Sequence, residues 1–401
     1  MEKKSIYLFQ PYLRKHILDF QKALPHFEFR VKSKKFSQTR SFYKVSMSTP
    51  EKEFSRSKIT WKNKLRRIFG ILNVRVHMSA KNDALFTYGC LLITNKPYCT
   101  YIENGAALFN YDVAILRNPL AQLWFSLLIR LPQCKKLIFM SKTAKQSMLA
   151  TGKFSPRVRE IIEAKSVQIY PFVEQARDTT PKKFQDSLRL LFTGIYYVKG
   201  GREVVNAFEI LQKKGVDVSL TIVTPLHMLL PEDRTRIESI PHIQLLDATL
   251  SSEEMMVLYK KYDVFLFPTF RDTFGLVLIE AIASGMALIG TEQYATQEMI
   301  IDNFNGFLYQ YHPLMDYDPQ TKEMYGKLYD AKVLYQRLFE AEKNGEMKPL
   351  EEFLVHSILQ FFENTELLEK FSKNSLTLYQ EKFSSQKVSA QIESIFAEAL
   401  H

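Results

Sequence analysis

The chain has 401 residues, of which 46% are hydrophobic and 24% are charged, and it contains only 14 glycines. This length indicates two or three domains or one large α/β unit, and the composition allows a sizeable core. Its three cysteines (Cys90, Cys99 and Cys134) are odd in number and form no C-x-x-C pair. A disulfide framework or a zinc site is therefore not expected, and a reducing compartment fits better.

No segment reads as a membrane span or a signal peptide. The first residues, MEKKSIYLFQPYLRKH, hold no long apolar run, and PLAQLWFSLLIRL at 119–131 is too short and contains Arg130. We therefore expect a cytoplasmic protein, either free or peripheral at the inner face of the membrane.

The net charge of +11 is unevenly distributed along the chain. Residues 1–180 contain 32 Lys and Arg against 12 Asp and Glu, a balance of +20, whereas the remainder contains 22 bases and 31 acids, a balance of −9. Such asymmetry indicates two domains with different partners, and the basic half is expected to meet something anionic.

The first half alternates between apolar runs and amphipathic stretches, the rhythm of a parallel α/β sheet. Strands are predicted at 5–11 and 27–31, with a helix between them that carries apolar residues at helical spacing. The following segment, 32–80, is polar and basic, and WKNKLRRIFGILNVRV at 61–76 indicates the start of a basic amphipathic helix. Further strands are predicted at 84–89, 96–105, 136–141 and 166–172, and helices near 117–131 and at 143–152.

The second half has a cleaner α/β series after a polar, proline-containing linker at 175–187. Strands are predicted at 188–194, 218–224, 264–268 and 286–292, helices at 199–215 and after Gly275, and mostly helix beyond residue 320. The predicted organisation is a first domain over 1–180, a second over 188–380, and a final helix over 381–401 that packs back on the first domain.

The segment PTFRDTFGLVLIEAIASG at 268–285 joins a strand end to a helix that starts after Gly275. The free amides and the dipole of a helix N-terminus favour an anion, and glycine allows the backbone to approach it closely. Asp272 in the loop and Glu280 in the helix would flank that anion with carboxylates that accept hydrogen bonds from vicinal hydroxyls. The pattern suits a nucleotide sugar, and it also fits an ordinary strand, loop and helix with an acid in the loop.

A second segment, LFTGIYYVKGGRE at 191–203, ends a predicted strand at Gly194 and opens the next helix at Lys199. The ammonium of Lys199 would neutralise a diphosphate through charge-assisted hydrogen bonds. A solvated Lys-Gly turn is the alternative, and the spacing is not that of a P-loop.

Together these segments resemble the retaining nucleotide-sugar glycosyltransferases of family 4, the group 1 glycosyltransferases. The family signature is an acid, seven residues and a Glu within P-S-x-x-E-x-F-G-x-x-x-x-E-A-x-A-x-G, and this chain has PTFRDTFGLVLIEAIASG. Flanking segments that resemble the family are KGGREVVNAF, YDVFLFP, QEMIIDNFNGFLY (297–309) and FMSKTAKQSML (139–149). The resemblance covers about 188–310 and implies the α/β GT-B fold, in which two Rossmann-like domains face each other across a cleft.

The resemblance also implies roles for individual residues. Glu280 would bind the ribose, Asp272 would contact the hydroxyls of the donor sugar, and the amides around Gly275 would hold the diphosphate. The implied donor-binding set is Gly194, Lys199, Arg202, Asp272, Thr273, Phe274, Gly275, Leu276 and Glu280. Asp272 is one methylene shorter than the family's usual Glu, and Ile195 occupies the position where the family usually has Arg, for which Arg202 is a candidate replacement.

In the first half, the segment TYIENGA at 100–106 joins a predicted strand to a turn that begins at Glu103. Glu103 is a candidate residue for the acceptor side of the cleft, and it also fits an ordinary acid at the end of a strand. The candidate catalytic residues are therefore Asp272, Glu280, Lys199 and Glu103. The family's retaining reaction is usually written as front-face attack, with charge developing on the leaving diphosphate, which Lys199 and the amides would stabilise.

No metal or other cofactor is expected besides the nucleotide sugar, which is a substrate. The eight histidines show no metal-binding spacing, and Asp316-Tyr317-Asp318, although formally D-x-D, lies in a polar loop beyond the donor core.

Residues 30–68 contain thirteen Lys and Arg, interleaved near the end with Trp61, Leu65 and Phe69. Such a segment suits an anionic membrane surface, and it also fits a solvated basic loop. No nucleic-acid partner is expected, because no RNA-binding or helix-turn-helix signature is present.

The sequence therefore predicts a retaining, metal-independent transferase that moves a sugar from a nucleotide sugar to a glycan or lipid-linked acceptor, in cell-surface polysaccharide or glycolipid synthesis. Two alternatives remain: a nucleotide-sugar epimerase of the same fold, and a non-catalytic, membrane-associated partner protein that keeps the fold.

Overall fold

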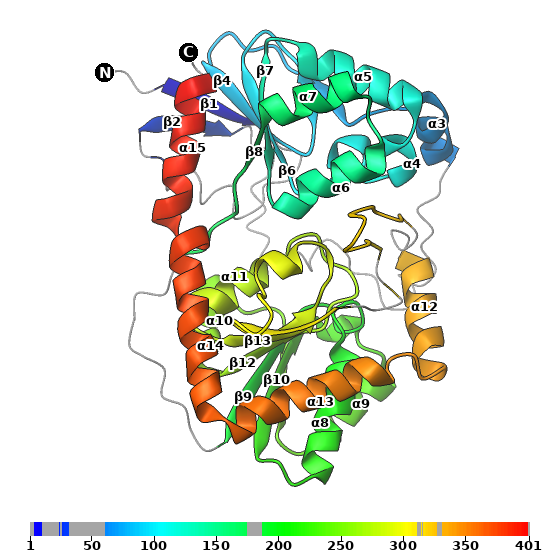
Figure 1. Cartoon of the computed structure of the whole chain (residues 1–401), viewed down its shortest axis with the longest axis vertical. Helices are drawn as coiled ribbons and strands as arrows, with labels where there is room; N and C mark the ends of the chain where they lie inside the picture. Colours follow the sequence, from blue (N-terminus) through cyan, green and yellow to red (C-terminus); the bar gives the residue numbers. More distant parts are fainter. Residues whose placement is uncertain are drawn as a thin grey trace.

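The computed structural model describes residues 4–9, 24, 26–31, 61–174, 187–310, 314, 316–326 and 331–399. Figure 1 shows two α/β domains, one above the other, with the last helices running along one side of both. Most of the helix predicted between the first two strands, residues 32–60 of the basic segment and nearly all of the predicted linker lie outside the described residues.

The first domain is built on a parallel sheet in the order β2-β1-β4-β6-β7-β8. Its strands are β1 (Lys4–Phe9), β2 (Phe27–Val31), β4 (Ala84–Tyr88), β6 (Tyr98–Ile102), β7 (Cys134–Phe139) and β8 (Ser166–Gln168). A two-stranded ribbon pairs β3 (Val74–Val76) with β5 (Leu91–Ile93). The helices are α3 (Trp61–Phe69), α4 (Val113–Leu116), α5 (Pro119–Arg130), α6 (Lys142–Gly152) and α7 (Pro156–Lys165), with a 3₁₀ turn at Ala107–Phe109.

The second domain repeats this plan with the strand order β11-β10-β9-β12-β13-β14, again parallel throughout. Its strands are β9 (Leu188–Thr193), β10 (Val218–Thr224), β11 (Ile243–Asp247), β12 (Val264–Phe267), β13 (Ala287–Thr291) and β14 (Gly306–Tyr309). The helices packed around them are α8 (Gly201–Lys213), α9 (Pro231–Ser239), α10 (Ser252–Lys261) and α11 (Leu276–Ala283), with short helical turns at Leu226–Met228 and Tyr294–Glu298.

The central strands are almost continuous apolar runs because helices cover both faces of each sheet. Every residue of β4, β6, β12 and β13 is buried. Each strand order reverses at the strand that is first in the sequence of its domain, β1 or β9, as in doubly wound sheets, where ligands bind at the carboxyl ends of the strands.

The chain ends in four longer helices, α12 (Ala331–Lys343), α13 (Lys348–Glu363), α14 (Thr365–Leu378) and α15 (Ser385–Ala399), with a π-helical turn at Tyr379–Phe383. After this turn α15 lies against the first sheet, where the ring of Phe396 is 5.6 Å from that of Phe86, centroid to centroid (Figure 1). Lys136 of β7 forms a 2.7 Å ion pair with Glu398. The last helix thus belongs structurally to the first domain.

The basic amphipathic helix predicted to start in the 61–76 segment begins at Trp61 and ends at Phe69, because Gly70 adopts a positive φ of 60° and a Cβ there would lie 2.4 Å from the backbone nitrogen of Ala121. Residues 74–76 form β3 instead. Mostly helix is predicted beyond residue 320, and 331–399 is largely helical, whereas residues 321–326 form turns and part of an isolated bridge.

The described residues include no helix that is both long enough and apolar enough to cross a membrane. The three cysteines are free and buried.

Candidate active site

Lys199 lies where two neighbouring strands of the second sheet end. The loop after β9 begins at Gly194, and a Cβ at that position would lie 2.7 Å from Cγ of Lys199. Gly194 also has a φ of 141°, which side chains other than glycine rarely adopt. Because Gly194 has no side chain, the side chain of Lys199 can extend past it to the loop after β12.

The ammonium of Lys199 binds that loop at two points. Its Nζ donates to Oδ2 of Asp272 at 2.5 Å and to the carbonyl oxygen of Arg271 at 2.7 Å. It also lies 5.3 Å from the ring centroid of Phe267, the last residue of β12. Both partners of the ion pair are largely shielded, with side-chain exposures of 16% for Lys199 and 18% for Asp272.

Burial and pairing act in opposite directions on the two charges. Burial lowers the pKa of Lys199, and the Asp272 carboxylate opposes only part of that effect. For Asp272, burial raises the pKa, but the charge and hydrogen bond of Lys199, with backbone amides of the loop, hold it below its ordinary value. The contact geometry is that of an ion pair, so the site places a cation beside an anion.

Asp272 also shapes the entry to α11. Its Oδ1 accepts a hydrogen bond from the Phe274 amide at 3.0 Å, and the helix begins after Gly275, whose φ is 83°. Thr273 and Leu276 on either side are half-buried, and Glu280 is half-buried further into the helix. A helix N-terminus therefore lies where the sequence predicted an anion site, and its Phe274 amide is bound to Asp272.

The start of α8 is held equally close to β12. Gly200 has a φ of 79°, and a Cβ on it would lie 2.3 Å from the carbonyl oxygen of Pro268. The helix after Lys199 therefore begins in direct contact with the end of β12, which fixes Lys199 beside the 271–274 loop.

Arg202, predicted to bind the donor, lies in a different set of contacts. Its guanidinium pairs with Asp233 at 2.8 Å and with Glu342 of α12, and it lies 4.6 Å from the ring centroid of Phe339. Because two acids and an aromatic face surround it, Arg202 joins α8, α9 and α12. These contacts support a structural role and do not support the donor role predicted from sequence.

Glu103 lies just beyond the end of β6 and is buried. Its carboxylate accepts hydrogen bonds from the hydroxyls of Tyr88 and Tyr111, the latter at 2.6 Å. The turn that it begins reaches the second domain, where the Gly105 amide donates to the hydroxyl of Tyr294 at 2.9 Å. Glu103 thus begins a turn that contacts the second domain, and its own carboxylate is bound to tyrosines of the first domain.

Glu298 joins the domains and was not among the predicted site residues. Its carboxylate accepts hydrogen bonds from the amides of Lys142 and Thr143 at the start of α6, at 2.9 and 2.8 Å, and from the Tyr170 hydroxyl at 2.7 Å. The acid therefore caps a helix of the other domain, where the dipole favours negative charge. The sequence did offer a reason to consider Glu298 as a site residue, since it belongs to the family-like segment QEMIIDNFNGFLY.

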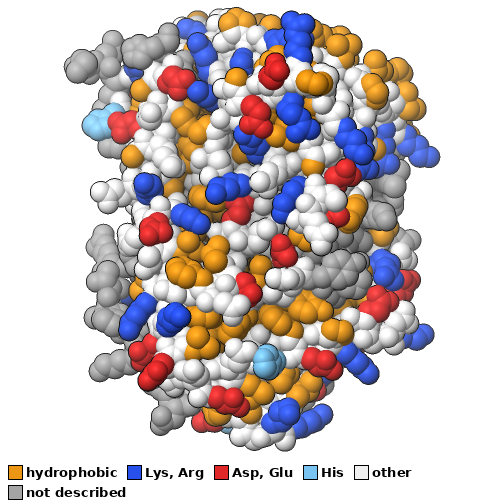
Figure 2. Space-filling model, in the orientation of Figure 1, with side chains coloured by type: hydrophobic (Ala, Val, Ile, Leu, Met, Phe, Trp, Pro, Cys, Tyr) orange, Lys and Arg blue, Asp and Glu red, His pale blue; other side chains and the backbone are white. Residues whose placement is uncertain are grey.

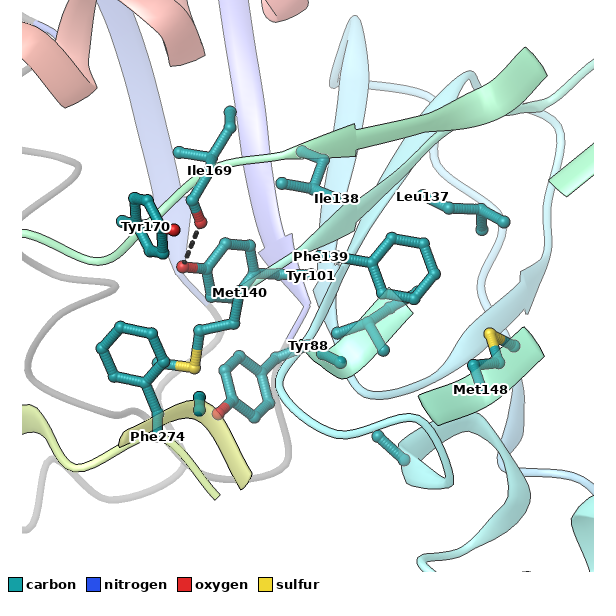
Figure 3. Packing of buried hydrophobic residues seen from close by; sticks show 14 of the residues in the cluster. Tyr88, Tyr101, Leu137, Ile138, Phe139, Met140, Met148, Ile169, Tyr170 and Phe274 are labelled. Carbon is teal, nitrogen blue, oxygen red and sulfur yellow. Dashed lines mark hydrogen bonds between the residues drawn. The ribbon is translucent and has the colours of Figure 1, made fainter. Parts of the chain in front are cut away.

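Hydrophobic side chains of the two domains meet beside the start of α11 (Figure 3). Figure 3 shows Phe274 of the second domain pointing toward Tyr170 and Met140 of the first, and the rings of Phe274 and Tyr170 are 6.2 Å apart. One hydrophobic cluster includes buried residues of both domains. A cavity of about 380 Å³ does open between the domains, but it is lined by Arg117, Gln122, Gly152, Lys153 and Glu323 rather than by the Lys199–Asp272 pair.

The D-x-D segment is engaged in a turn. Asp318 accepts hydrogen bonds from the amides of Gln320 and Thr321 at 2.8 and 3.1 Å, and Tyr317 between the acids is buried against Tyr294. Within the part of the chain that the structure describes, no group of three or more His, Cys, Asp or Glu side chains is placed to hold a metal ion.

The structure therefore brings Gly194, Lys199, Asp272, Phe274 and Gly275 together and separates Arg202 from them. Chemically, a shielded cation beside a helix N-terminus stabilises negative charge on a bound group, and a carboxylate next to both accepts hydrogen bonds from hydroxyls.

Residues 187–316 match the family model described as "Glycosyl transferases group 1". The capsular polysaccharide biosynthesis glycosyltransferase CapM of Staphylococcus aureus is 24% identical over 54% of this chain, and the match spans 58% of that protein. This chain thus matches little more than half the length of that curated relative.

Two solved structures share the arrangement of the whole chain. A glycosyltransferase from Rickettsia africae has a TM-score of 0.57 at 15% identity, with 100% of this chain and 99% of that one covered. Anabaena HepE in complex with UDP and glucose has a TM-score of 0.55 at 12% identity, with coverages of 99% and 100%. At these identities the likeness concerns the fold, which is GT-B.

Proposed function

We propose that this chain, which belongs to the group 1 glycosyltransferases through residues 187–316 and has the GT-B fold, transfers a sugar from a nucleotide sugar to a glycan or lipid-linked acceptor. The observation that carries the proposal is the Lys199–Asp272 pair, held at the ends of β9 and β12 in front of the α11 N-terminus.

In the proposed reaction the diphosphate binds between Lys199 and the amides around Gly275. The leaving group gains negative charge as the bond to the sugar breaks, and a fixed cation in a shielded site stabilises that charge without reorganising. Asp272 then exchanges part of its hydrogen bonding with Lys199 and Phe274 for the sugar hydroxyls, and Glu280 binds the ribose. Retention at the anomeric carbon and independence from metal ions belong to the same proposal.

The donor and acceptor classes follow from the similar proteins. HepE is in complex with UDP and glucose, so UDP-sugars are the first donors to test. CapM is named for capsular polysaccharide biosynthesis, so we propose an acceptor of that class, a growing glycan or its lipid-linked precursor.

Because the ring of Phe274 at the start of α11 packs 6.2 Å from that of Tyr170 of the other domain, we expect the donor to bind when the two domains separate from the arrangement in Figure 3. Closure around the bound donor then excludes water from the reaction, which limits hydrolysis of the donor.

The test has two stages. A panel of UDP-, GDP- and other nucleotide sugars is first screened by thermal shift, since a ligand that binds only the folded state raises its stability. The donor found is then incubated with and without glycan and lipid-linked acceptors, and the products are analysed by mass spectrometry and NMR.

Each outcome separates the proposal from its alternatives. Glycosylated acceptor with the anomeric configuration of the donor supports the proposal. Conversion of the donor sugar in the absence of acceptor supports an epimerase of the same fold. Donor binding without turnover over the acceptor panel supports a non-catalytic partner protein.

A further inference from the structure

Two helices of the first domain expose apolar stripes to solvent. In α3 no residue is buried, and Trp61, Ile68 and Phe69 have exposed fractions of 68%, 63% and 58%. In α5 an exposed stripe at helical spacing consists of Leu120, Leu123, Trp124, Leu127 and, just beyond the helix, Leu131. Large apolar side chains exposed in such a group mark an interaction site.

The two stripes are parts of one surface. The side-chain amide of Asn118, which caps the start of α5, donates to the backbone oxygen of Arg67 in α3 at 2.6 Å. Gly70 at the end of α3 packs so closely on Ala121 that a Cβ would lie 2.4 Å from its backbone nitrogen. We call residues 61–69 with the exposed stripe of α5 the α3–α5 surface.

This surface is basic: its α3 part contains Lys62, Lys64, Arg66 and Arg67 and no acid, and α5 ends at Arg130. The acids in the range 61–131 are Glu103, which is buried, Asp83, which bonds Ser5, and Asp112, which pairs with Arg67 at 2.7 Å. Figure 2 shows hydrophobic and basic side chains side by side over the region where Figure 1 places α3 and α5.

Both tryptophans of the chain, Trp61 and Trp124, lie on the α3–α5 surface. Tryptophan is favoured where an apolar phase meets water, since its ring has an apolar body and a polar N–H. Lysine, in contrast, is depleted at the centres of protein interfaces. Exposed tryptophan and leucine beside an excess of positive charge match an anionic bilayer better than a protein partner.

We propose that the α3–α5 surface binds the interface of an anionic lipid bilayer, with Trp61, Trp124 and the leucines of α5 entering the acyl boundary and the bases of α3 meeting lipid headgroups. This binding is independent of the sugar transfer proposed above. It differs from the prediction for residues 30–68 because half of the surface comes from α5, a helix outside that segment.

The position of α5 connects this surface to the space between the domains. Gln122 on α5 lines the cavity of about 380 Å³ together with Arg117 and with Glu323 of the second domain. A membrane on the α3–α5 surface would therefore lie beside an opening of the interdomain space, from which a lipid-linked molecule can be reached.

Tryptophan fluorescence tests the proposal directly because the two tryptophans report only on this surface. Vesicles of phosphatidylcholine with one-third phosphatidylglycerol are added to the full chain, and a blue shift of the emission is expected, with quenching by brominated lipid. Pure phosphatidylcholine vesicles should give a much weaker effect.

Variants then separate the charged and apolar contributions. Lys62→Glu/Lys64→Glu should weaken binding in vesicle sedimentation by about tenfold or more, since each base near an anionic surface favours binding. Trp61→Ser/Trp124→Ser should weaken it similarly. The matched controls are Lys213→Glu/Lys214→Glu, exposed at the end of α8, and Val257→Ser, whose side chain is 58% exposed on α10, and both should bind as the unmodified chain does.

Three results would overturn the proposal. One is the absence of a blue shift with anionic vesicles. Another is equal weakening in the α8 and α10 controls. The third is light scattering that finds a dimer which Trp61→Ser/Trp124→Ser converts to monomer, because the surface would then be covered by a second copy of the chain.

Discussion

The ammonium of Lys199 reaches the carboxylate of Asp272 at 2.5 Å although the two residues are 73 positions apart, and this ion pair joins the loops that follow β9 and β12. The contact depends on Gly194, because any side chain there would occupy the path of Lys199. The two family-like segments of the sequence therefore meet in one charged site.

Gly194→Ala should disrupt this site while the fold remains. The new methyl group would lie 2.7 Å from Cγ of Lys199 and would force it aside, so donor affinity should fall by about tenfold or more. Donor titration by calorimetry measures the effect. Gly215→Ala is the control, since Gly215 also has a positive φ but nothing lies within 4 Å of its added Cβ. Equal donor affinity in the unmodified chain and Gly194→Ala would refute the steric role.

Arg202→Met should reduce stability rather than donor affinity. It leaves Asp233, which is 7% exposed, without its strongest partner, and breaking a buried ion pair costs roughly 3 kcal/mol. Urea unfolding measures the loss, and donor titration of the folded variant should stay within about twofold of the unmodified value. A tenfold loss of affinity at unchanged stability would instead restore the donor role predicted from sequence.

Glu203 makes the stability of the second domain dependent on pH. Burial raises its pKa to about 8, helped by the charges of Glu342 and Glu351. The folded state therefore keeps a proton that the unfolded chain loses above its ordinary pKa near 4.5, so the free energy of unfolding contributed by this group falls as pH rises from about 4.5 to 8.

Glu203→Gln removes this dependence because glutamine is neutral throughout. The free energy of unfolding of the variant should be close to that of the unmodified chain near pH 5 and exceed it increasingly up to pH 8, by on the order of 3–4 kcal/mol, with a matching rise in Tm. Thermal melts across this range measure the difference, with exposed Glu232→Gln as the control. A difference that does not change with pH would contradict this assignment.

The sequence predicted the regular part of the fold well. The predicted strand 218–224 is β10 to the residue, and the helix predicted at 143–152 is α6 with one residue added, because buried strands and capped helices have strong local patterns. The end of α3 was not predictable, since it depends on the contact of Gly70 with Ala121, fifty-one positions along the chain.

The candidate site was predictable only where it depends on local sequence patterns. Local patterns placed Lys199 and Gly275 at helix starts, where the structure has them. The ion pairs of Arg202 are with Asp233 and Glu342, which are 31 and 140 positions away. No local sequence pattern specifies contacts at such separations. The contact of Glu298 with Thr143 spans 155 positions and likewise appears only when the domains meet.

Glu298→Ala should loosen the interface between the domains. It removes charge-assisted hydrogen bonds to the Lys142 and Thr143 amides and to the Tyr170 hydroxyl, and each such bond contributes about 1.5–3 kcal/mol. Small-angle scattering should show a larger radius of gyration, and limited proteolysis should be faster. Glu238→Ala is the control, as it removes only an exposed pair with Arg234. An unchanged radius would show that the interface does not depend on this acid.

The most direct test of the proposed function is sugar transfer by Lys199→Met/Asp272→Leu, with Lys213→Met as the control. Replacing both partners leaves no unpaired buried charge, and apolar replacements of a buried ion pair are often neutral for stability. We expect the double variant to keep its Tm within a few degrees and to lose at least about a hundredfold in turnover of the donor identified by the screen, since the fixed cation at the leaving diphosphate is gone. Turnover within about threefold of the unmodified chain would contradict the assignment of Lys199 and Asp272 to the transfer site.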